Sequence, residues 1–176
     1  MKFPIYSGIA LLAMSAAIFS HTDGGTASSK ASQQSKTQAM NCDAMNERGD
    51  QAMGFSHLKA THHFRLTSDG GAIEIEANGA QDKATRDEIR MHLTHIAQMF
   101  SEGNFNAPMF IHDQTPPGVP IMQRLKSEIR YEFEKMPRGG RLRIKTSNTE
   151  ALAAIQDFFR FQINEHKTGD ALEIKN

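Results

Sequence analysis

The sequence predicts an α+β domain in which a ββα unit occurs twice, giving a four-stranded antiparallel sheet with two main helices on one face. Three observations carry this prediction. Residues 61–78 and 129–147 both alternate apolar and polar side chains around a double glycine. Each segment is followed by a stretch of helical periodicity that ends near a glycine. The order and spacing of these features agree between the two copies, as expected of an internal repeat.

The first 50 residues are expected to lie outside this domain. Lys2 precedes the apolar run GIALLAMSAAIF (8–19), which has the basic start and the length of a secretory signal and is too short to span a bilayer. We therefore assign residues 1–20 to a signal peptide and expect an exported protein, periplasmic or secreted. Residues 21–50 are interpreted as a flexible polar tether, which leaves a single domain at 51–176.

Charge and cysteine content narrow the function classes. The chain has 20 basic and 20 acidic residues, so no basic surplus points to nucleic acid or to an anionic membrane surface. No second apolar run of membrane length follows the signal, so no membrane span is expected in the mature form. Cys42 is the single cysteine, which excludes a disulfide within the chain. It is either a free or intermolecularly paired thiol or a soft metal ligand beside Met40 and Met45.

Each copy of the unit begins with a hairpin whose turn contains two glycines, SDGG or PRGG. With four-residue loops, Phe64 faces Ile75 in the first hairpin and Phe133 faces Ile144 in the second. This register places apolar pairs on one face and opposite charges on the other. We interpret the charged face as a solvated surface of ion pairs, with a binding surface as the alternative.

Each hairpin is followed by a helix with one apolar stripe. The stripe of the first helix is Ile89, Leu93, Ile96 and Phe100, and that of the second is Leu152, Ile155, Phe159 and Ile163. The halves extend over about 55–104 and 120–170. Residues 105–119 join them and are rich in proline, so we expect an irregular crossover there, with a lid over a site as the alternative. PIMQRLKSE (120–128) predicts a short helix with Pro120 in its first turn.

One flank of the first helix carries four side chains of types that ligate metals. They are Glu88, His92, His95 and Met99. Spacings of three and four residues place them on one continuous lateral stripe, which lets two imidazoles approach a single ion. Imidazole with thioether suits copper, whereas imidazole with carboxylate suits zinc. His62, which shares strand parity with Phe64, and His112 in the joining segment are candidates to complete the site.

The histidines also fit a packing role. Counted back from the helix-terminal glycines, the second half has Phe158, Phe161 and Tyr131 where the first has His92, His95 and His62. These positions therefore accept apolar bulk, which favours semi-buried packing residues. The same asymmetry is what a single site confined to one half requires. His166 ends the second helix, where an imidazole can stabilise the helix dipole.

The sequence contains none of the common catalytic or cofactor motifs. HxxH in the first helix lacks the HExxH pattern of zinc proteases, and CxxCH, GxSxG and a Walker loop are all missing from the sequence.

The combination of MGF (53–55), THHFRL (61–66), IRMHLTHIAQMF (89–100), PPGVPIMQRLK (116–126) and FFRFQINEHKTGD (158–170) resembles a group of small exported bacterial proteins without an established activity. The resemblance covers residues 53–170, and some members of the group carry an aspartate carbamoyltransferase label. That enzyme family uses two α/β domains and a Ser-Thr-Arg-Thr phosphate loop, whereas the nearest string here is ATRD (84–87). The resemblance therefore implies an exported protein but no catalytic residue.

Three functions follow in order of preference. The first is an exported, non-enzymatic binding domain with a transition-metal ion on the flank of the first helix, copper being the first choice and zinc the second. The second is a metal-free interaction or assembly domain with a protein partner or a second copy of itself. The third is a small enzyme that uses a histidine as general base, which needs a nucleophile or an oriented carboxylate beside that histidine.

Overall fold

The computed structural model describes residues 43–174. The predicted signal peptide (1–20), Cys42 and the first part of the predicted tether lie outside the described residues.

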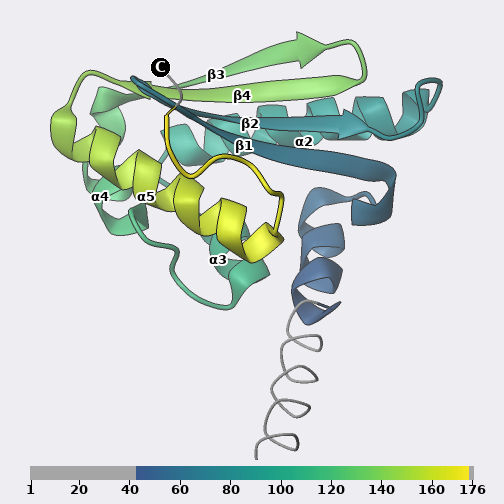
Figure 1. The fold of residues 1–176 in the computed structure, drawn as a ribbon, viewed down its shortest axis with the longest axis horizontal. Helices are drawn as coiled ribbons and strands as arrows, with labels where there is room; N and C mark the ends of the chain where they lie inside the picture. The colour runs from purple at the N-terminus through teal and green to yellow at the C-terminus, as the bar shows by residue number, and fades with distance from the viewer. Residues whose placement is uncertain (1–42, 175–176) are drawn as a thin grey trace, which may run out of the picture. The chain divides into compact units, whose positions relative to one another are not determined.

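Four strands form one antiparallel sheet in the order β1-β2-β4-β3 (Figure 1). Each hairpin consists of two strands of eight residues, and the second strands of the two hairpins pair with each other in the middle of the sheet. The α+β class and the antiparallel sheet are therefore confirmed. The strands are β1 (Ala60–Thr67), β2 (Gly70–Ala77), β3 (Ile129–Met136) and β4 (Gly139–Thr146).

The register of both hairpins differs from the prediction by two residues. Phe64 is paired with Ile73 rather than Ile75, and Phe133 is paired with Leu142 rather than Ile144. The loops contain two residues instead of four, because both glycines of each pair belong to the second strand. Since a shift of two residues keeps each side chain on its face, the division into an apolar and a charged face is unaffected.

The glycines at the start of β2 and β4 allow these two strands to approach each other. A Cβ atom on Gly139 would lie 1.9 Å from the carbonyl oxygen of Ile75, and one on Gly70 would lie 2.0 Å from the carbonyl oxygen of Ile144. Any other residue at either position would push the central strands apart. The double glycines thus serve the pairing of the two hairpins as well as their turns.

Five α-helices accompany the sheet in the described part of the chain. They are residues 43–53, α2 (Lys83–Ser101), α3 (Asn106–His112), α4 (Val119–Arg124) and α5 (Thr149–His166). Two short 3₁₀ turns, η1 (His57–Lys59) and η2 (Lys126–Glu128), precede β1 and β3. Helix α2 contacts β2, β3 and β4, while α5 contacts β1, β2 and β4.

The core contains the predicted stripe of α2 in full, and most of that of α5. Ile89, Leu93, Ile96 and Phe100 are all buried. In α5, Ile155, Phe159 and Ile163 are buried, but Leu152 is half-exposed and the neighbouring Ala151 is buried in its place.

The joining segment is more regular than predicted. Helix α3 occupies Asn106–His112, so the prediction of an irregular crossover over 105–119 is wrong there. Pro108 lies in the first turn of α3, where a backbone N–H has no partner within the helix and proline is tolerated. The short helix predicted with Pro120 in its first turn is confirmed as α4, although it ends at Arg124.

The folded part also begins earlier than residue 51. Residues 43–53 are helical, although residues up to 50 were assigned to the tether. Met45 and Gly49 are buried, and Met53 packs against the core. These three positions are spaced by four residues and form a narrow stripe among polar ones. The Nε of Arg48 donates to the carbonyl oxygen of Ile111, 2.8 Å away, and so ties this helix to α3.

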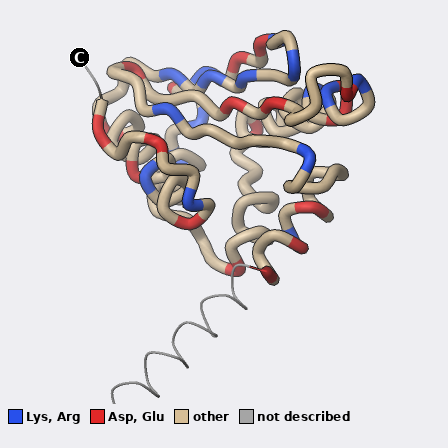
Figure 2. Tube along the Cα trace, turned by 45° about the vertical axis from the view of Figure 1, so that its right-hand side comes forward, with Lys and Arg blue, Asp and Glu red and all other residues tan. Residues whose placement is uncertain are grey.

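The charged face of the sheet is internally paired. Acidic residues of β2 and β3 lie beside basic residues of β1 and β4, so the sign of the charge alternates across the sheet (Figure 2). The guanidinium of Arg141 lies 2.7 Å from Glu74 and 3.3 Å from Glu134, its neighbours on either side, and Arg143 also binds Glu134. Among residues 43–174, no helix is both long and apolar enough to cross a bilayer.

Candidate functional site

The domain contains a largely apolar cavity of about 110 Å³ that is partly open to solvent. Its walls come from the helix over 43–53, both strands of the first hairpin, α2, α3 and α5. Four imidazoles and two thioethers interrupt the apolar lining, and no carboxylate or lysine lines it. These side chains are His57, His62, His92, His166, Met45 and Met53.

Gly49 leaves part of this space open. It lies in the middle of the helix over 43–53, faces the cavity and has an ordinary helical backbone. A Cβ atom there would meet only the methyl group of Met53, at 3.7 Å, which is a normal contact. Glycine inside a helix costs about 1 kcal/mol relative to alanine. The sequence therefore carries a destabilising residue at a position where a side chain would fit.

His62 brings an imidazole next to a thioether. Its Nε2 lies 3.2 Å from Sδ of Met53. The ring stacks on Phe55 and on His166, both with centroids 6.4 Å away. Burial, with smaller contributions from His57 and His63, lowers the pKa of His62 to about 4, so the ring is neutral at pH 7.

His92 reaches the cavity from α2. Its ring stands edge-on to Phe55, with centroids 5.9 Å apart. Burial lowers the pKa of His92 to about 4, with smaller contributions from His62 and His95. Like His62, it presents a neutral ring with one basic nitrogen.

His57 is oriented by a carboxylate. Its Nδ1 lies 2.9 Å from Oδ1 of Asp50, which also accepts a hydrogen bond of 2.6 Å from the His57 backbone N–H. Burial opposes ionisation of Asp50, but the hydrogen bonds from His57 outweigh it and lower the pKa of the carboxyl group. A carboxylate can only accept, so Nδ1 carries the proton and Nε2 keeps a free lone pair. Metal-binding and general-base histidines are oriented in this way.

A second set of polar side chains lies where α5 meets α3. It consists of His166, Gln162 and His112. The rings of His166 and His112 lie 5.0 Å apart, and burial lowers the pKa of His166 to about 3. His112 is also buried, and its Nε2 lies 3.1 Å from Oε1 of Gln162. Gln162 is only 4% exposed, and its amide nitrogen has no hydrogen-bond partner, nor does Nδ1 of His112. Because burial keeps His166 neutral, it does not supply the charge that stabilises a helix dipole.

The structure brings together only part of the predicted metal stripe. His62 and His92 both line the cavity, and His112 adjoins it through Gln162 and His166. Glu88, His95 and Met99 do not line it; His95 is exposed, and Met99 packs partly against the core. Within residues 43–174, no three or more His, Cys, Asp or Glu side chains are grouped so as to hold a metal ion.

Sequence reasoning missed Met53, His57, Gln162 and His166 as members of the site. Met53 and His57 follow a segment interpreted as tether, so nothing suggested that they approach β1. The available signal was the four-residue spacing of Met45, Gly49 and Met53.

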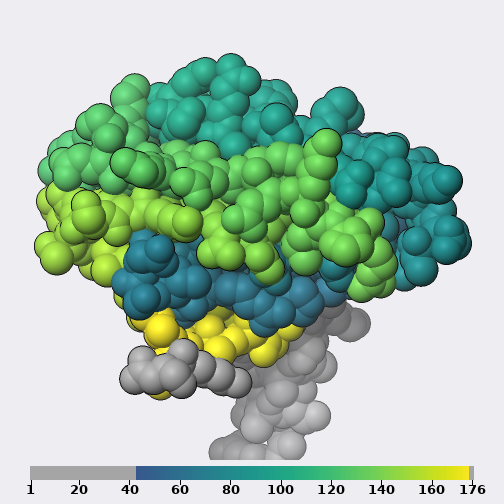
Figure 3. Space-filling model, turned by 90° about the horizontal axis from the view of Figure 1, so that it is seen from above, coloured from purple at the N-terminus to yellow at the C-terminus, as the bar shows by residue number. Residues whose placement is uncertain are grey.

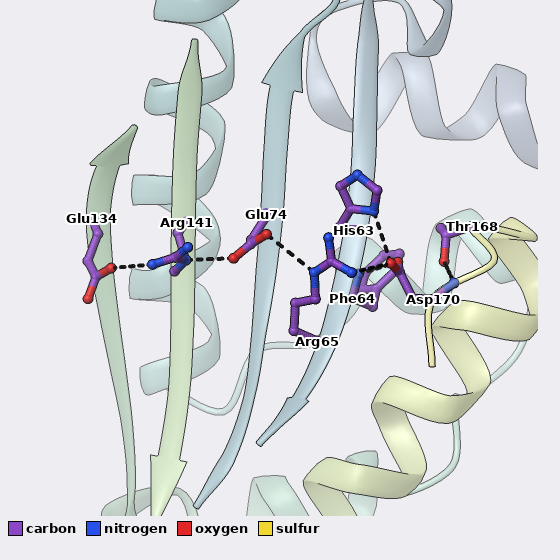
Figure 4. Close-up of polar contacts among 8 residues, drawn as sticks. All are labelled: His63, Phe64, Arg65, Glu74, Glu134, Arg141, Thr168 and Asp170. Atoms are coloured by element: carbon purple, nitrogen blue, oxygen red, sulfur yellow. Dashed lines mark hydrogen bonds and ion pairs between the residues drawn. The ribbon is translucent and has the colours of Figure 1, made fainter. Parts of the chain in front are cut away.

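A second polar cluster secures the edge of the sheet. The side chain of Asp170 follows α5 and is only 4% exposed. It accepts hydrogen bonds from the backbone N–H of Phe64 (2.9 Å), from Arg65 (2.7 Å) and from His63 (3.0 Å) (Figure 4). Seen from above, the yellow C-terminal residues run beside the blue first hairpin (Figure 3). The cluster covers the free edge of β1.

Comparison with known proteins supplies no relative: no protein-family model, no curated protein and no solved structure matches this chain.

Proposed function

We propose that the domain binds a small ligand, and that the cavity lined by histidine and methionine is its binding site. The observation that carries this proposal is the buried, unpartnered amide of Gln162 in the wall of a cavity that Gly49 leaves open. A buried polar group without a partner costs about 1–3 kcal/mol. A ligand that accepts a hydrogen bond from the Gln162 amide would offset part of that cost.

Pure packing gives a poorer account of the same residues. If the cavity were only an imperfection of the core, alanine at position 49 and an apolar residue at position 162 would both improve stability. A site that must admit a ligand instead favours a residue without a side chain at position 49 and a polar residue at position 162, as in this sequence.

One contact supports the enzyme alternative, but the cavity offers no nucleophile or acid to act with it. Asp50 orients His57, as a general base requires. The residues that line the cavity, however, include no serine, threonine, cysteine or acidic side chain to act as nucleophile or acid. The interaction-domain alternative, with a protein partner or a second copy, remains a prediction. The pairing of Arg141 with Glu74 and Glu134 gives it no support from the charged face.

The proposal is tested by filling the cavity. Mature wild-type protein, purified from its native compartment, is examined by mass spectrometry under native conditions and by elemental analysis. A Gly49→Leu variant is compared with Gln51→Leu, which adds the same side chain at an exposed position of the same helix. We expect a bound species in the wild type and in Gln51→Leu, and none in Gly49→Leu. Retention of the same species by Gly49→Leu, or its lack in the wild type, would overturn the proposal.

We also propose that the protein acts after export, as the apolar run at 8–19 and the resemblance to small exported proteins suggest. Fractionation of cells that produce the full chain tests this. A full-length chain retained in the cytoplasm would contradict it.

The internal repeat, with its two main helices on one face, is a further proposal. Equal strand lengths, two-residue turns and the matching positions of Gly70 and Gly139 support it. An experimental structure, in which the segment from β1 to α2 is superposed on that from β3 to α5, tests it. Helices on opposite faces of the sheet would refute it.

A further inference from the structure

We propose that the cavity is a Cu(I) site in which Sδ of Met53 and Nε2 of His62 are two ligands and His57 supplies the third. This inference rests on the proposed function, since it places a metal ion in the same cavity, at Met53 and His62. A cation accepts no hydrogen bond, so the Gln162 amide is not one of its contacts. The ion then lies between the helix over 43–53 and β1, and not on the flank of α2 that the sequence predicted.

The two central donors lie close enough to share one ion. Nε2 of His62 and Sδ of Met53 are 3.2 Å apart. Metal–nitrogen and metal–sulfur bonds measure about 2.0–2.3 Å, so their sum exceeds this separation and an ion can contact both atoms. Methionine has three rotatable bonds, which lets the sulfur adjust to the ion without moving the backbone.

The Asp50–His57 pair supplies orientation and charge. Asp50 fixes the proton of His57 on Nδ1 and leaves Nε2 as the donor atom, in the carboxylate–histidine arrangement typical of metal ligands. The Asp50 carboxylate also brings a negative charge to within 2.9 Å of the His57 ring. A cation at the centre of these three side chains is therefore partly compensated, although no carboxylate contacts it directly.

The donors favour a soft, singly charged ion. Both donor types are neutral, and the thioether is soft whereas imidazole is intermediate. A set that includes a thioether favours Cu(I) over the hard divalent ions that prefer carboxylates. The remaining lining is largely apolar and carries no charged side chain, and the penalty for burying an ion in such surroundings rises steeply with its charge. Zn(II), the other ion that the sequence suggested, lacks here both a thiolate and a carboxylate ligand.

Cu(I) competition tests this assignment. The mature protein, carrying Cys42→Ser so that this thiol cannot bind copper, is titrated without oxygen against a colorimetric Cu(I) chelator. Met53→Leu and His62→Phe each remove one donor, and Met99→Leu and His95→Phe are matched controls on the flank of α2. We expect one Cu(I) per chain, affinity at least tenfold lower in the first two variants, and unchanged affinity in the controls.

X-ray absorption supplies a readout that a folding defect would not imitate. The wild-type Cu(I) complex should show one sulfur neighbour, which disappears in Met53→Leu while bound nitrogen remains. Equal loss of affinity in Met99→Leu, or stronger binding of Zn(II) than of Cu(I), would overturn the assignment. If wild-type protein binds no Cu(I) but its cavity retains another species that Gly49→Leu excludes, this inference fails while the proposed function stands. If neither is found, both fail.

Discussion

Acidification should destabilise the metal-free domain well before its carboxylates are protonated. The folded-state pKa is about 4 for His62 and His92 and about 3 for His166, in each case because of burial. An unfolded histidine has a pKa of about 6.5. Below that pH these histidines bind protons in the unfolded chain but not in the folded one. Their contribution to the free energy of unfolding is therefore fully present above pH 6.5 and is lost as the pH falls toward 3.

The size of this effect follows from the same shifts. Each pH unit between the two pKa values removes about 1.4 kcal/mol per histidine. From neutral pH to pH 5, each of the three rings therefore accounts for about 2 kcal/mol, and together they account for roughly 6 kcal/mol. Domains of this size are stable by only about 5–15 kcal/mol. The free energy of unfolding should thus fall by a large fraction at pH 5.

Urea denaturation of metal-free protein between pH 7.5 and 5 measures this loss. His92→Leu should reduce the loss of stability between pH 7.5 and 5 by about 2 kcal/mol, which is the contribution of this ring. His95→Leu, at an exposed position of the same helix, is the matched control and should leave the slope as it is. A total loss below about 1 kcal/mol in the wild type would refute the view that these rings are kept neutral by burial.

Three further substitutions test the scaffold in the same assay. Gly139→Ala should lower the free energy of unfolding by about 3 kcal/mol, because its Cβ would strike the carbonyl oxygen of Ile75; an unchanged urea midpoint would contradict the close approach of β2 and β4. Asp170→Asn should lower the free energy of unfolding by about 1–2 kcal/mol. It should also speed hydrogen exchange of the Phe64 amide, and unaltered exchange would show that the edge is held by other contacts. Gly49→Ala should raise the free energy of unfolding by about 1 kcal/mol, whereas a loss would mean that the cavity wall is not free there.

The sequence predicted the parts of this fold that depend on local periodicity. The buried stripe of α2 and the separation of apolar from charged faces in both hairpins follow from spacings of three to four and of two residues. The exact pairing did not follow, since SDGG and PRGG fit a two-residue or a four-residue loop equally well. The choice between them depends on Gly139 and Ile75, which are far apart in the sequence and meet across the middle of the sheet.

The candidate site was harder to predict because it depends on the helix over 43–53. That helix has only Met45, Gly49 and Met53 as its apolar signal, and it lies in a polar region that resembles a tether. His62 and His92 could be proposed from strand parity and helix spacing. Their partner Met53 could not, since nothing local indicates that its sulfur reaches β1.

The helix over 43–53 also accounts for the imidazoles at positions 62 and 92 of the first hairpin–helix segment, where the second segment has Tyr131 and Phe158. In the second segment, Phe158 and Tyr131 each pack edge-on against Phe100, and Phe105 stacks on the same ring with centroids 4.3 Å apart. That cluster is filled by aromatic rings. At the first segment, the covering residues include Gly49, whose missing side chain leaves space. Neutral imidazoles tolerate an apolar wall yet keep a basic nitrogen, and both His62 and His92 line the space that Gly49 leaves open.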